Sequence, residues 1–208
     1  MTRDPVSETL TLLDWKRRVT QLYAGIRAEP DPETAWRAWQ HTRNSLFREH
    51  TQSPVPVGER SAYAGPHLYP YDPAWRTLAT VESLEPVRFE LVASNAEVVA
   101  FRRWARAHFP IGGAELSLDL YWLEGYGGGL FLPFADTTSG GETYGAGRYL
   151  LDTIKGADLG AQDDRLVLDF NFAYQPSCSY DSRWTCPLAP AGNRLALATE
   201  AGEKLVAA

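Results

Sequence analysis

The spacing of apolar residues changes near residue 75, and this change limits the chain to a fold that contains both helices and sheet. From residue 12 to residue 26, apolar side chains recur at alternating intervals of three and four, as on one stripe of an α-helix. These residues are Leu12, Trp15, Val19, Leu22 and Ile26. After residue 75, apolar and polar residues alternate, as in strands with one face in a core. The sequence therefore predicts a helical N-terminal segment followed by a β-rich body.

A second helix is predicted from Pro32 to about Glu49. Asp31 followed by Pro32 is typical of a helix start, because aspartate caps free backbone N–H groups and proline suits the first helical position. The apolar residues of this helix are Trp36, Trp39, Leu46 and Phe47. Both apolar stripes need a surface to cover, so we expect the two helices to pack on each other and on the sheet.

Residues 51–74 are predicted to form a loop, because five prolines and two glycines between residues 51 and 73 disfavour regular structure. The loop also contains Tyr63, Tyr69 and Tyr71. Solvated linkers rarely carry such aromatic residues, so we expect this loop to lie against the body. The length of 208 residues fits one core. We expect a single domain made of the helical segment 1–50, the loop 51–74 and the β-rich body 75–208.

The clearest strand is predicted at residues 115–122, where Leu116, Leu118 and Leu120 occupy every second position. Further strands are expected at residues 87–93, 97–109, 130–134, 148–154, 165–170 and 194–199. Residues 97–109 also fit a helix, and we favour a strand. Glycine-rich turns join these segments, so the sequence predicts a mainly β, α+β fold: an antiparallel β-barrel or sandwich of about seven strands, preceded by two N-terminal helices.

Charge and hydropathy exclude several classes of function. The net charge is −6 and the longest basic run is Lys16-Arg17-Arg18, so we expect no binding to nucleic acid. The first residues do not resemble a secretory leader, and no window approaches about 18 uninterrupted apolar residues. We therefore expect a soluble, cytoplasmic protein with no membrane partner. The sequence leaves the cofactor and the oligomeric state open.

The first segment that can carry chemistry is residues 133–149, which is rich in hydroxyl groups and glycine. Such a loop can bring backbone N–H groups close to an anion, with Arg148 as a bidentate clamp. The alternative is a hairpin connection in which Asp136 and the neighbouring threonines bond to the backbone of the turn itself.

The second segment is residues 169–180, at the end of a predicted strand. Because side chains alternate along a strand, Asp169 faces away from Leu168 and Phe170, and we expect it to point into the barrel. Burial there would raise the pKa of the carboxyl group and suit it to acid or base chemistry. The alternative is an aspartate that accepts hydrogen bonds from the loop beyond it.

The third segment, residues 184–193, contains Cys186, and seven residues separate it from Cys178, the only other cysteine. This spacing is longer than that of a zinc knuckle and no histidine lies near in sequence, so we expect no metal site. Buried free thiols, a disulfide and a reactive thiol stay open as alternatives. The four histidines match no catalytic or metal-binding motif.

Short motifs, most of them in the last third of the chain, resemble one known family. They are Leu-Pro-Phe-Ala-Asp at 132–136, Thr-Tyr-Gly-Ala-Gly-Arg-Tyr at 143–149, Asp-Phe-Asn-Phe-Ala-Tyr at 169–174, Cys-Ser-Tyr at 178–180, Cys-Pro-Leu at 186–188, Asn-Arg-Leu at 193–195 and Ala-Gly-Glu-Lys at 201–204. With these motifs the chain resembles the bacterial and archaeal domain-of-unknown-function family 1684. Gln175 stands where the family is expected to have Asn, and Gly192 stands where it is expected to have Glu. The resemblance implies no particular reaction.

Together, residues 133–203 predict a pocket for a small anionic metabolite, with polar groups from strand ends set in an aromatic wall. The residues expected to line it are Tyr144, Arg148, Asp169, Asn171, Tyr174 and Tyr180. We expect Arg148 and Asp169 to meet, because the short connection 155–164 can pair their strands as a hairpin. One alternative is an enzyme, with Asp169 or Glu203 as acid or base or Cys178 as nucleophile. The other is a scaffold whose helices dock a partner chain.

Overall fold

The computed structural model describes residues 4–92 and 98–205 of the chain. Two helices, α1 (Pro5–Ala28) and α2 (Pro32–Glu49), occupy the N-terminal segment. The Asp31 carboxylate caps α2 by accepting a hydrogen bond from the Thr34 backbone N–H at 3.0 Å. Both predicted helices are confirmed, and α1 extends beyond its apolar stripe in both directions.

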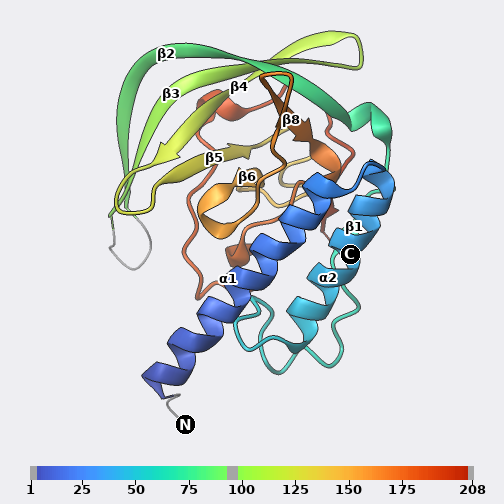
Figure 1. Ribbon diagram of the computed structural model, residues 1–208, viewed down its shortest axis with the longest axis vertical. Helices are drawn as coiled ribbons and strands as arrows, with labels where there is room; N and C mark the ends of the chain where they lie inside the picture. Colours follow the sequence, from blue (N-terminus) through green and yellow to red (C-terminus); the bar gives the residue numbers. More distant parts are fainter. Residues whose placement is uncertain (1–3, 93–97, 206–208) are drawn as a thin grey trace.

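Seven strands form one antiparallel sheet with the order β6-β5-β4-β3-β2-β8-β7. These strands are β2 (Arg76–Val92), β3 (Val98–Ile111), β4 (Ala114–Leu123), β5 (Gly129–Phe134), β6 (Arg148–Asp152), β7 (Ala161–Gln162) and β8 (Arg165–Asp169). The sheet is curled into a half-barrel, and Figure 1 shows β2, β3 and β4 arching over the C-terminal part of the chain. The predicted α+β fold, two helices followed by about seven antiparallel strands, is confirmed.

The proline-rich loop lies against the body of the protein, as its tyrosines predicted. A two-residue strand in this loop, β1 (His67–Leu68), pairs with β9 (Glu203–Lys204) close to the C-terminus. Tyr69 is buried, and its hydroxyl donates a hydrogen bond to Glu142 at 3.0 Å. Tyr63 packs on Phe47 of α2, with 6.1 Å between the ring centroids. The loop therefore connects α2 with the C-terminal residues.

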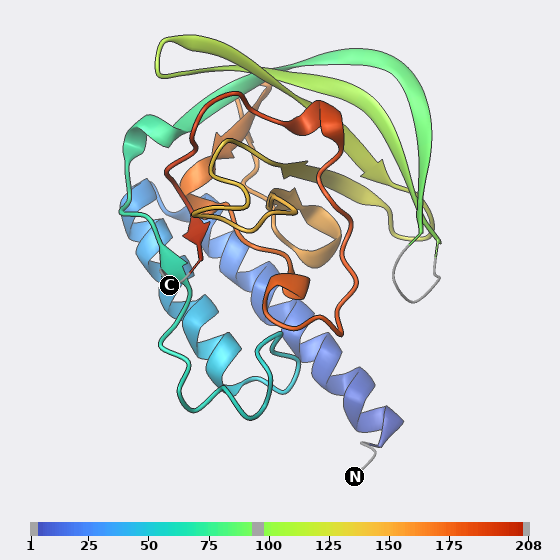
Figure 2. The same ribbon diagram turned by 180° about the vertical axis from the view of Figure 1, so that it is seen from behind.

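The core lies between the inner face of the curled sheet and the two helices. Its centre is aromatic, because Phe170 contacts both Phe109 and Phe134, with ring centroids 5.7 and 5.2 Å apart. Trp39 of α2 reaches this core and packs edge-on against Phe172. Figures 1 and 2 show α1 and α2 side by side, with the C-terminal segments between them and the arch of β2, β3 and β4. Within the described residues, neither helix combines the length and apolar character that crossing a membrane requires.

Two sequence predictions about the sheet are wrong. Residues 194–199 do not form a strand: Arg194 makes one isolated bridge with Ala135, and the Thr199 carbonyl accepts a hydrogen bond from the Arg148 side chain instead of from a strand. The strands of Arg148 and Asp169 do not form a hairpin either, because β6 pairs with β5 while β8 pairs with β2 and β7. The ends of two predicted strands fall on residues 93–97, which lie outside the described residues.

Candidate functional site

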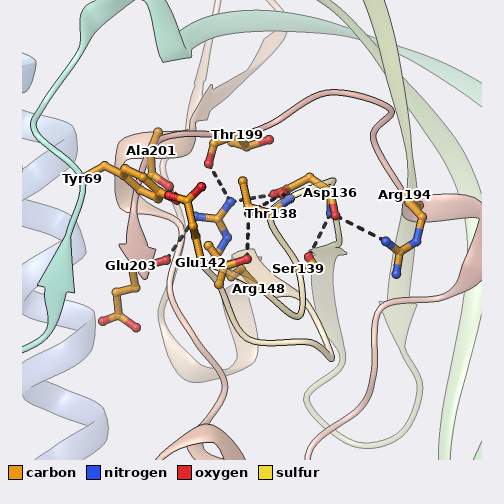
Figure 3. A network of polar contacts seen from close by, with 11 residues as sticks. Tyr69, Asp136, Thr138, Ser139, Glu142, Arg148, Arg194, Thr199, Ala201 and Glu203 are labelled. Atoms are coloured by element: carbon orange, nitrogen blue, oxygen red, sulfur yellow. Dashed lines mark hydrogen bonds and ion pairs between the residues drawn. The ribbon is translucent and has the colours of Figure 1, made fainter. Parts of the chain in front are cut away.

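Arg148 at the start of β6 lies at the centre of a buried polar network (Figure 3). Its side chain is 1% exposed and forms an ion pair with Asp136 at 2.7 Å. The guanidinium also donates to the backbone carbonyls of Thr199, Ala201 and Glu203. Because all of these acceptors belong to the protein, the predicted anion clamp serves here to fix the C-terminal segment against the sheet.

Asp136, the partner of Arg148, is also held from the other side. Its second carboxylate oxygen accepts hydrogen bonds from the backbone N–H of Thr138, at 2.7 Å, and from the hydroxyl of the same residue. The arrangement matches the second alternative that the sequence left open for residues 133–149, since Asp136 and Thr138 bond within their own turn, and Arg148 pairs with Asp136. Both carboxylate oxygens are therefore satisfied within the fold.

Glu203 belongs to a second buried cluster, and Figure 3 shows its carboxylate pointing away from Arg148. The carboxylate accepts hydrogen bonds from the Gln175 backbone N–H at 2.7 Å, from the Tyr180 hydroxyl at 3.0 Å and from Arg43 of α2. Burial, followed by the charge of Glu203, raises the pKa of Tyr180 well above its ordinary value. The cluster fixes α2 to the C-terminal segment and leaves Glu203 fully engaged with protein donors.

Asp169 at the end of β8 is the buried carboxylate that the fold leaves partly unpaired. Its side chain is 2% exposed, and Oδ1 accepts hydrogen bonds from the Asn171 backbone N–H at 3.0 Å and side-chain amide at 2.9 Å. Oδ2 has no hydrogen-bond partner in the described part of the chain. Arg76 stands opposite in the β2–β8 register, but its Nε lies 3.9 Å from this oxygen. That distance is too long for a hydrogen bond.

Burial dominates the electrostatics of Asp169. It raises the pKa of the carboxyl group to about 6, against the hydrogen bonds from Asn171 and the charge of Arg76, which both lower it. The pKa rise that the sequence predicted for this residue agrees with this direction. A carboxyl group with this pKa is present in both protonation states near neutral pH.

Asp169 lines a cleft of about 350 Å³ between the helices and the β7–β8 end of the sheet. The apolar part of its wall includes Ile26 and Ala35 from the helices and Phe172 from the turn after β8. Two arginines, Arg27 and Arg76, are also among its lining residues. Below we refer to this space as the Asp169 cleft. Its wall combines apolar side chains with four charged ones, those of Arg27, Glu29, Arg76 and Asp169.

Asn171 fixes the position of Asp169. Its side-chain amide donates to the Asp72 carbonyl at 2.8 Å, and its side-chain oxygen accepts from the Asp72 backbone N–H at 3.0 Å. The Trp36 indole N–H donates to the Asn171 carbonyl at 3.0 Å, so α2, the loop and the end of β8 all meet at this residue. Asn171 thus holds the carboxylate through contacts from three separate parts of the chain.

The other predicted pocket residues lie in different surroundings. Tyr174 packs beneath the Arg43 guanidinium, at 4.9 Å from its ring centroid, beside a smaller cavity of about 90 Å³. Tyr144 directs its hydroxyl toward the sulfur of Cys178 at 3.6 Å. The structure therefore brings Asp169 and Asn171 together, while Tyr174, Tyr144 and Arg148 belong to three separate neighbourhoods. Within the described residues, no group of three or more potential His, Cys, Asp or Glu ligands could hold a metal ion.

The sequence did not indicate Arg43 or Arg76 as candidate residues. Arg43 carries a detectable signal, because it lies four positions from both Trp39 and Phe47 and so interrupts an apolar stripe. A charge on such a stripe predicts a buried ion pair. Arg76 has no comparable signal, since only the pairing of β2 with β8 places it opposite Asp169.

A curled antiparallel half-barrel closed by two N-terminal helices and braced by buried arginine–carboxylate pairs defines the structural class of the protein. Within that class, the chain belongs to the family described as Protein of unknown function (DUF1684), whose model matches residues 61–204. A solved structure of an uncharacterised protein from Haloarcula marismortui is 34% identical to the chain, with a TM-score of 0.58. The match covers 83% of this chain and 94% of that one. No curated protein matches the chain.

Proposed function

We propose that the protein binds a small organic anion in the Asp169 cleft. The observation that carries the proposal is the Oδ2 atom of Asp169, which is buried, lacks a hydrogen-bond partner in the described residues and belongs to a residue that lines the cleft. An unsatisfied buried carboxylate oxygen destabilises a fold. A bound ligand that donates a hydrogen bond to this oxygen would remove that penalty.

The chemistry of the cleft defines the class of ligand. Arg76 lines it with a side chain that is one-third exposed, and this guanidinium is suited to a carboxylate or phosphate group. Ionised Asp169 accepts a hydrogen bond from a hydroxyl or amino group, and protonated Asp169 donates one. The ligand would thus carry an anionic group next to a hydroxyl or amino group, as hydroxy acids, amino acids and sugar phosphates do.

A thermal-shift screen of such anions at pH 7 would identify ligands, and calorimetry would then compare variants. We expect Asp169→Asn and Arg76→Gln each to weaken binding about tenfold or more, as loss of a charged hydrogen bond usually does. Asp163→Asn and Arg165→Gln are matched controls, because both residues are exposed and lie at the β7–β8 turn outside the lining. Unchanged affinity in both cleft variants would contradict the proposed site.

A second candidate function is acid or base catalysis by Asp169. It is favoured by the pKa of about 6, which leaves the carboxyl group able to accept or release a proton near neutral pH. Incubation of each bound compound with the protein from pH 5 to pH 8, followed by mass spectrometry, separates the two functions. Turnover with an inflection near pH 6 that disappears in Asp169→Asn indicates catalysis, whereas an unchanged compound indicates binding alone.

We further propose a cytoplasmic location, which is compatible with the free thiols of Cys178 and Cys186. Reducing compartments keep such thiols free, whereas secreted proteins more often contain disulfides. Fractionation of cells that produce the protein would test this location.

A further inference from the structure

The two cysteines come together in a part of the molecule that the proposed function does not use. Cys178 lies in the short 3-10 helix η4 (Ser177–Ser179), and the chain returns after seven residues to Cys186. The backbone N–H of Cys178 donates a hydrogen bond to the Cys186 sulfur at 3.3 Å. Both thiols are free and both residues are partly exposed. The cysteines are therefore neighbours, and neither residue is fully buried.

The surroundings of the pair distinguish its two members. Cys178 also receives a hydrogen bond from the Tyr144 hydroxyl, with 3.6 Å between oxygen and sulfur. A hydrogen bond from Cys186, and to a lesser degree the Tyr144 hydroxyl and the charge of Lys155, lower the pKa of Cys178 to about 6, although burial opposes them. The same contact raises the pKa of Cys186, because the Cys186 thiol acts as the donor. The Tyr144 hydroxyl thus favours the thiolate on Cys178.

We propose that Cys178 and Cys186 form a reversible dithiol–disulfide pair that exchanges with small-molecule disulfides, with Cys178 as the attacking thiol and Cys186 as the resolving thiol. The site rests on the contact between the two residues and on the Tyr144 hydroxyl. It is independent of the Asp169 cleft, so the two proposals can fail separately.

The exchange is balanced by the disulfide that serves as oxidant. The Cys178 thiolate attacks one sulfur of that disulfide, a mixed disulfide forms, and the other half leaves as a thiolate. Cys186 then loses its proton to solvent and attacks the Cys178 sulfur. The internal disulfide forms and the second half of the small molecule leaves as a thiolate. Two thiols of the protein are oxidised, and one external disulfide is reduced to two thiols.

The internal disulfide would close a loop that includes Tyr180. The Tyr180 hydroxyl donates to the buried Glu203 carboxylate at 3.0 Å, and its ring packs edge-on against Phe47 of α2. Cys186 also packs against the buried cluster that contains Phe131 and Tyr149. Oxidation would therefore cross-link a segment that already connects α2 to the C-terminal residues.

Glutathione disulfide is the probe for this proposal, with intact-mass spectrometry as the readout. The wild-type protein should pass through a single glutathione adduct and end as an internal disulfide without glutathione. Cys186→Ser should stop at one glutathione on Cys178. Cys178→Ser should acquire glutathione on Cys186 about tenfold more slowly, because the attacking thiolate is absent. In denaturant the two single variants should react at equal rates, since the folded surroundings are lost.

Two results would overturn the proposal. One is a Cys178→Ser variant that acquires glutathione as rapidly as Cys186→Ser in the native state. The other is wild-type protein that retains glutathione or forms disulfide-linked dimers instead of an internal bond. A measurement on unmodified protein guards against variants that fold poorly: brief alkylation with iodoacetamide followed by peptide mapping should label Cys178 before Cys186, and equal or reversed labelling would contradict the assigned roles.

Discussion

Two of the arginine–aspartate pairs of the protein, Arg148–Asp136 and Arg76–Asp169, use the same residue types but differ in how tightly they are bonded. The ion pair between Arg148 and Asp136 is closed: its atoms are 2.7 Å apart, and both side chains are at most 1% exposed. The pair between Arg76 and Asp169 is open: its closest atoms are 3.9 Å apart, and Arg76 is 33% exposed. The residues of the second pair line the Asp169 cleft. Burial of charge alone therefore does not identify a binding site in this fold.

The difference lies in which groups remain unsatisfied. In the closed pair, both oxygens of Asp136 and both terminal nitrogens of Arg148 are hydrogen-bonded, while the buried Nε of Arg148 lacks a partner among the described residues. In the open pair, one oxygen of Asp169 is buried without a partner among the described residues. A carboxylate whose two oxygens are both bonded within the protein stabilises one conformation, whereas an unpaired buried carboxylate oxygen can serve a ligand. The comparison predicts opposite consequences of substitution at the two sites.

The largest effect is expected from deletion of residues 1–50. The helices provide part of the wall of the Asp169 cleft, and Trp39 covers Phe172 in the core. Their removal should expose this apolar surface, so we expect aggregation instead of a folded monomer. Size-exclusion chromatography and thermal unfolding provide the measurement. A truncated protein that stays monomeric with unchanged thermal stability would refute our proposal that residues 1–208 form a single domain.

Substitution of the closed pair should destabilise the fold strongly. Arg148→Ala leaves Asp136 charged and buried and removes the donor from three carbonyls, which should lower the free energy of unfolding by roughly 3–5 kcal/mol. Urea denaturation measures the change. Arg165→Ala is the matched control, because its side chain is 44% exposed, and it should change stability by less than about 1 kcal/mol. Equal stability of the two variants would contradict a structural role for Arg148.

Local sequence signals predicted the helices and most of the strands, whereas long-range pairing escaped them. The α2 boundaries follow from the Asp31 cap and Pro32, both of which act within one turn. Residues 194–199 have the composition of a strand, but Arg148 takes the Thr199 carbonyl that a neighbouring strand would bond. A side chain about 50 residues away cannot be inferred from local periodicity.

The candidate site was also only partly predictable, because local signals indicate single residues and not their long-range neighbours. Alternation along the strand correctly indicated a buried Asp169 with a raised pKa. Its neighbours in the cleft, such as Ile26 and Ala35, come from helices more than 100 residues away and gave no signal. The expected contact with Arg148 failed because β8 pairs with the first residues of β2, which places Arg76 opposite Asp169. The sequence located these strands, but it did not show which strands are neighbours in the sheet, and this limited the prediction.

Substitution of Asp169 in the open pair should stabilise the fold. The pKa of Asp169 is raised from 3.8 to about 6, so the unfolded chain ionises first as the pH rises, and the folded state loses stability between these values. Above pH 6 the loss is complete and amounts to about 3 kcal/mol. Asp169→Asn removes the charge, and its side-chain oxygen can still accept from Asn171. We expect it to stabilise the protein by about 2–3 kcal/mol at pH 7 and by little near pH 4.

Urea denaturation at both pH values measures this change, with Asp163→Asn as the exposed control. The control residue has a positive φ of 50°, a conformation that asparagine tolerates well. Two results would contradict this prediction: a stability gain for Asp169→Asn that persists at pH 4, or a stability loss at pH 7. Either would show that the Asp169 carboxylate is better hydrogen-bonded than we infer.

The smallest effect is expected from Arg76→Gln, which tests how far the open pair interacts at all. Arg76 lies 3.9 Å from Asp169 and is partly exposed. Among the groups that lower the pKa of Asp169, it therefore has the smallest effect. Its removal should therefore raise the pKa of Asp169 slightly further, while the free energy of unfolding changes by less than about 1 kcal/mol. NMR titration of the carboxyl carbon provides the measurement, with Arg165→Gln as control.

A large rise in the pKa of Asp169 would mean that the pair is closed in solution and that a ligand must displace Arg76 from Asp169. An unchanged pKa would mean that Arg76 is free to bind the anionic group while Asp169 separately binds the neighbouring hydroxyl or amino group.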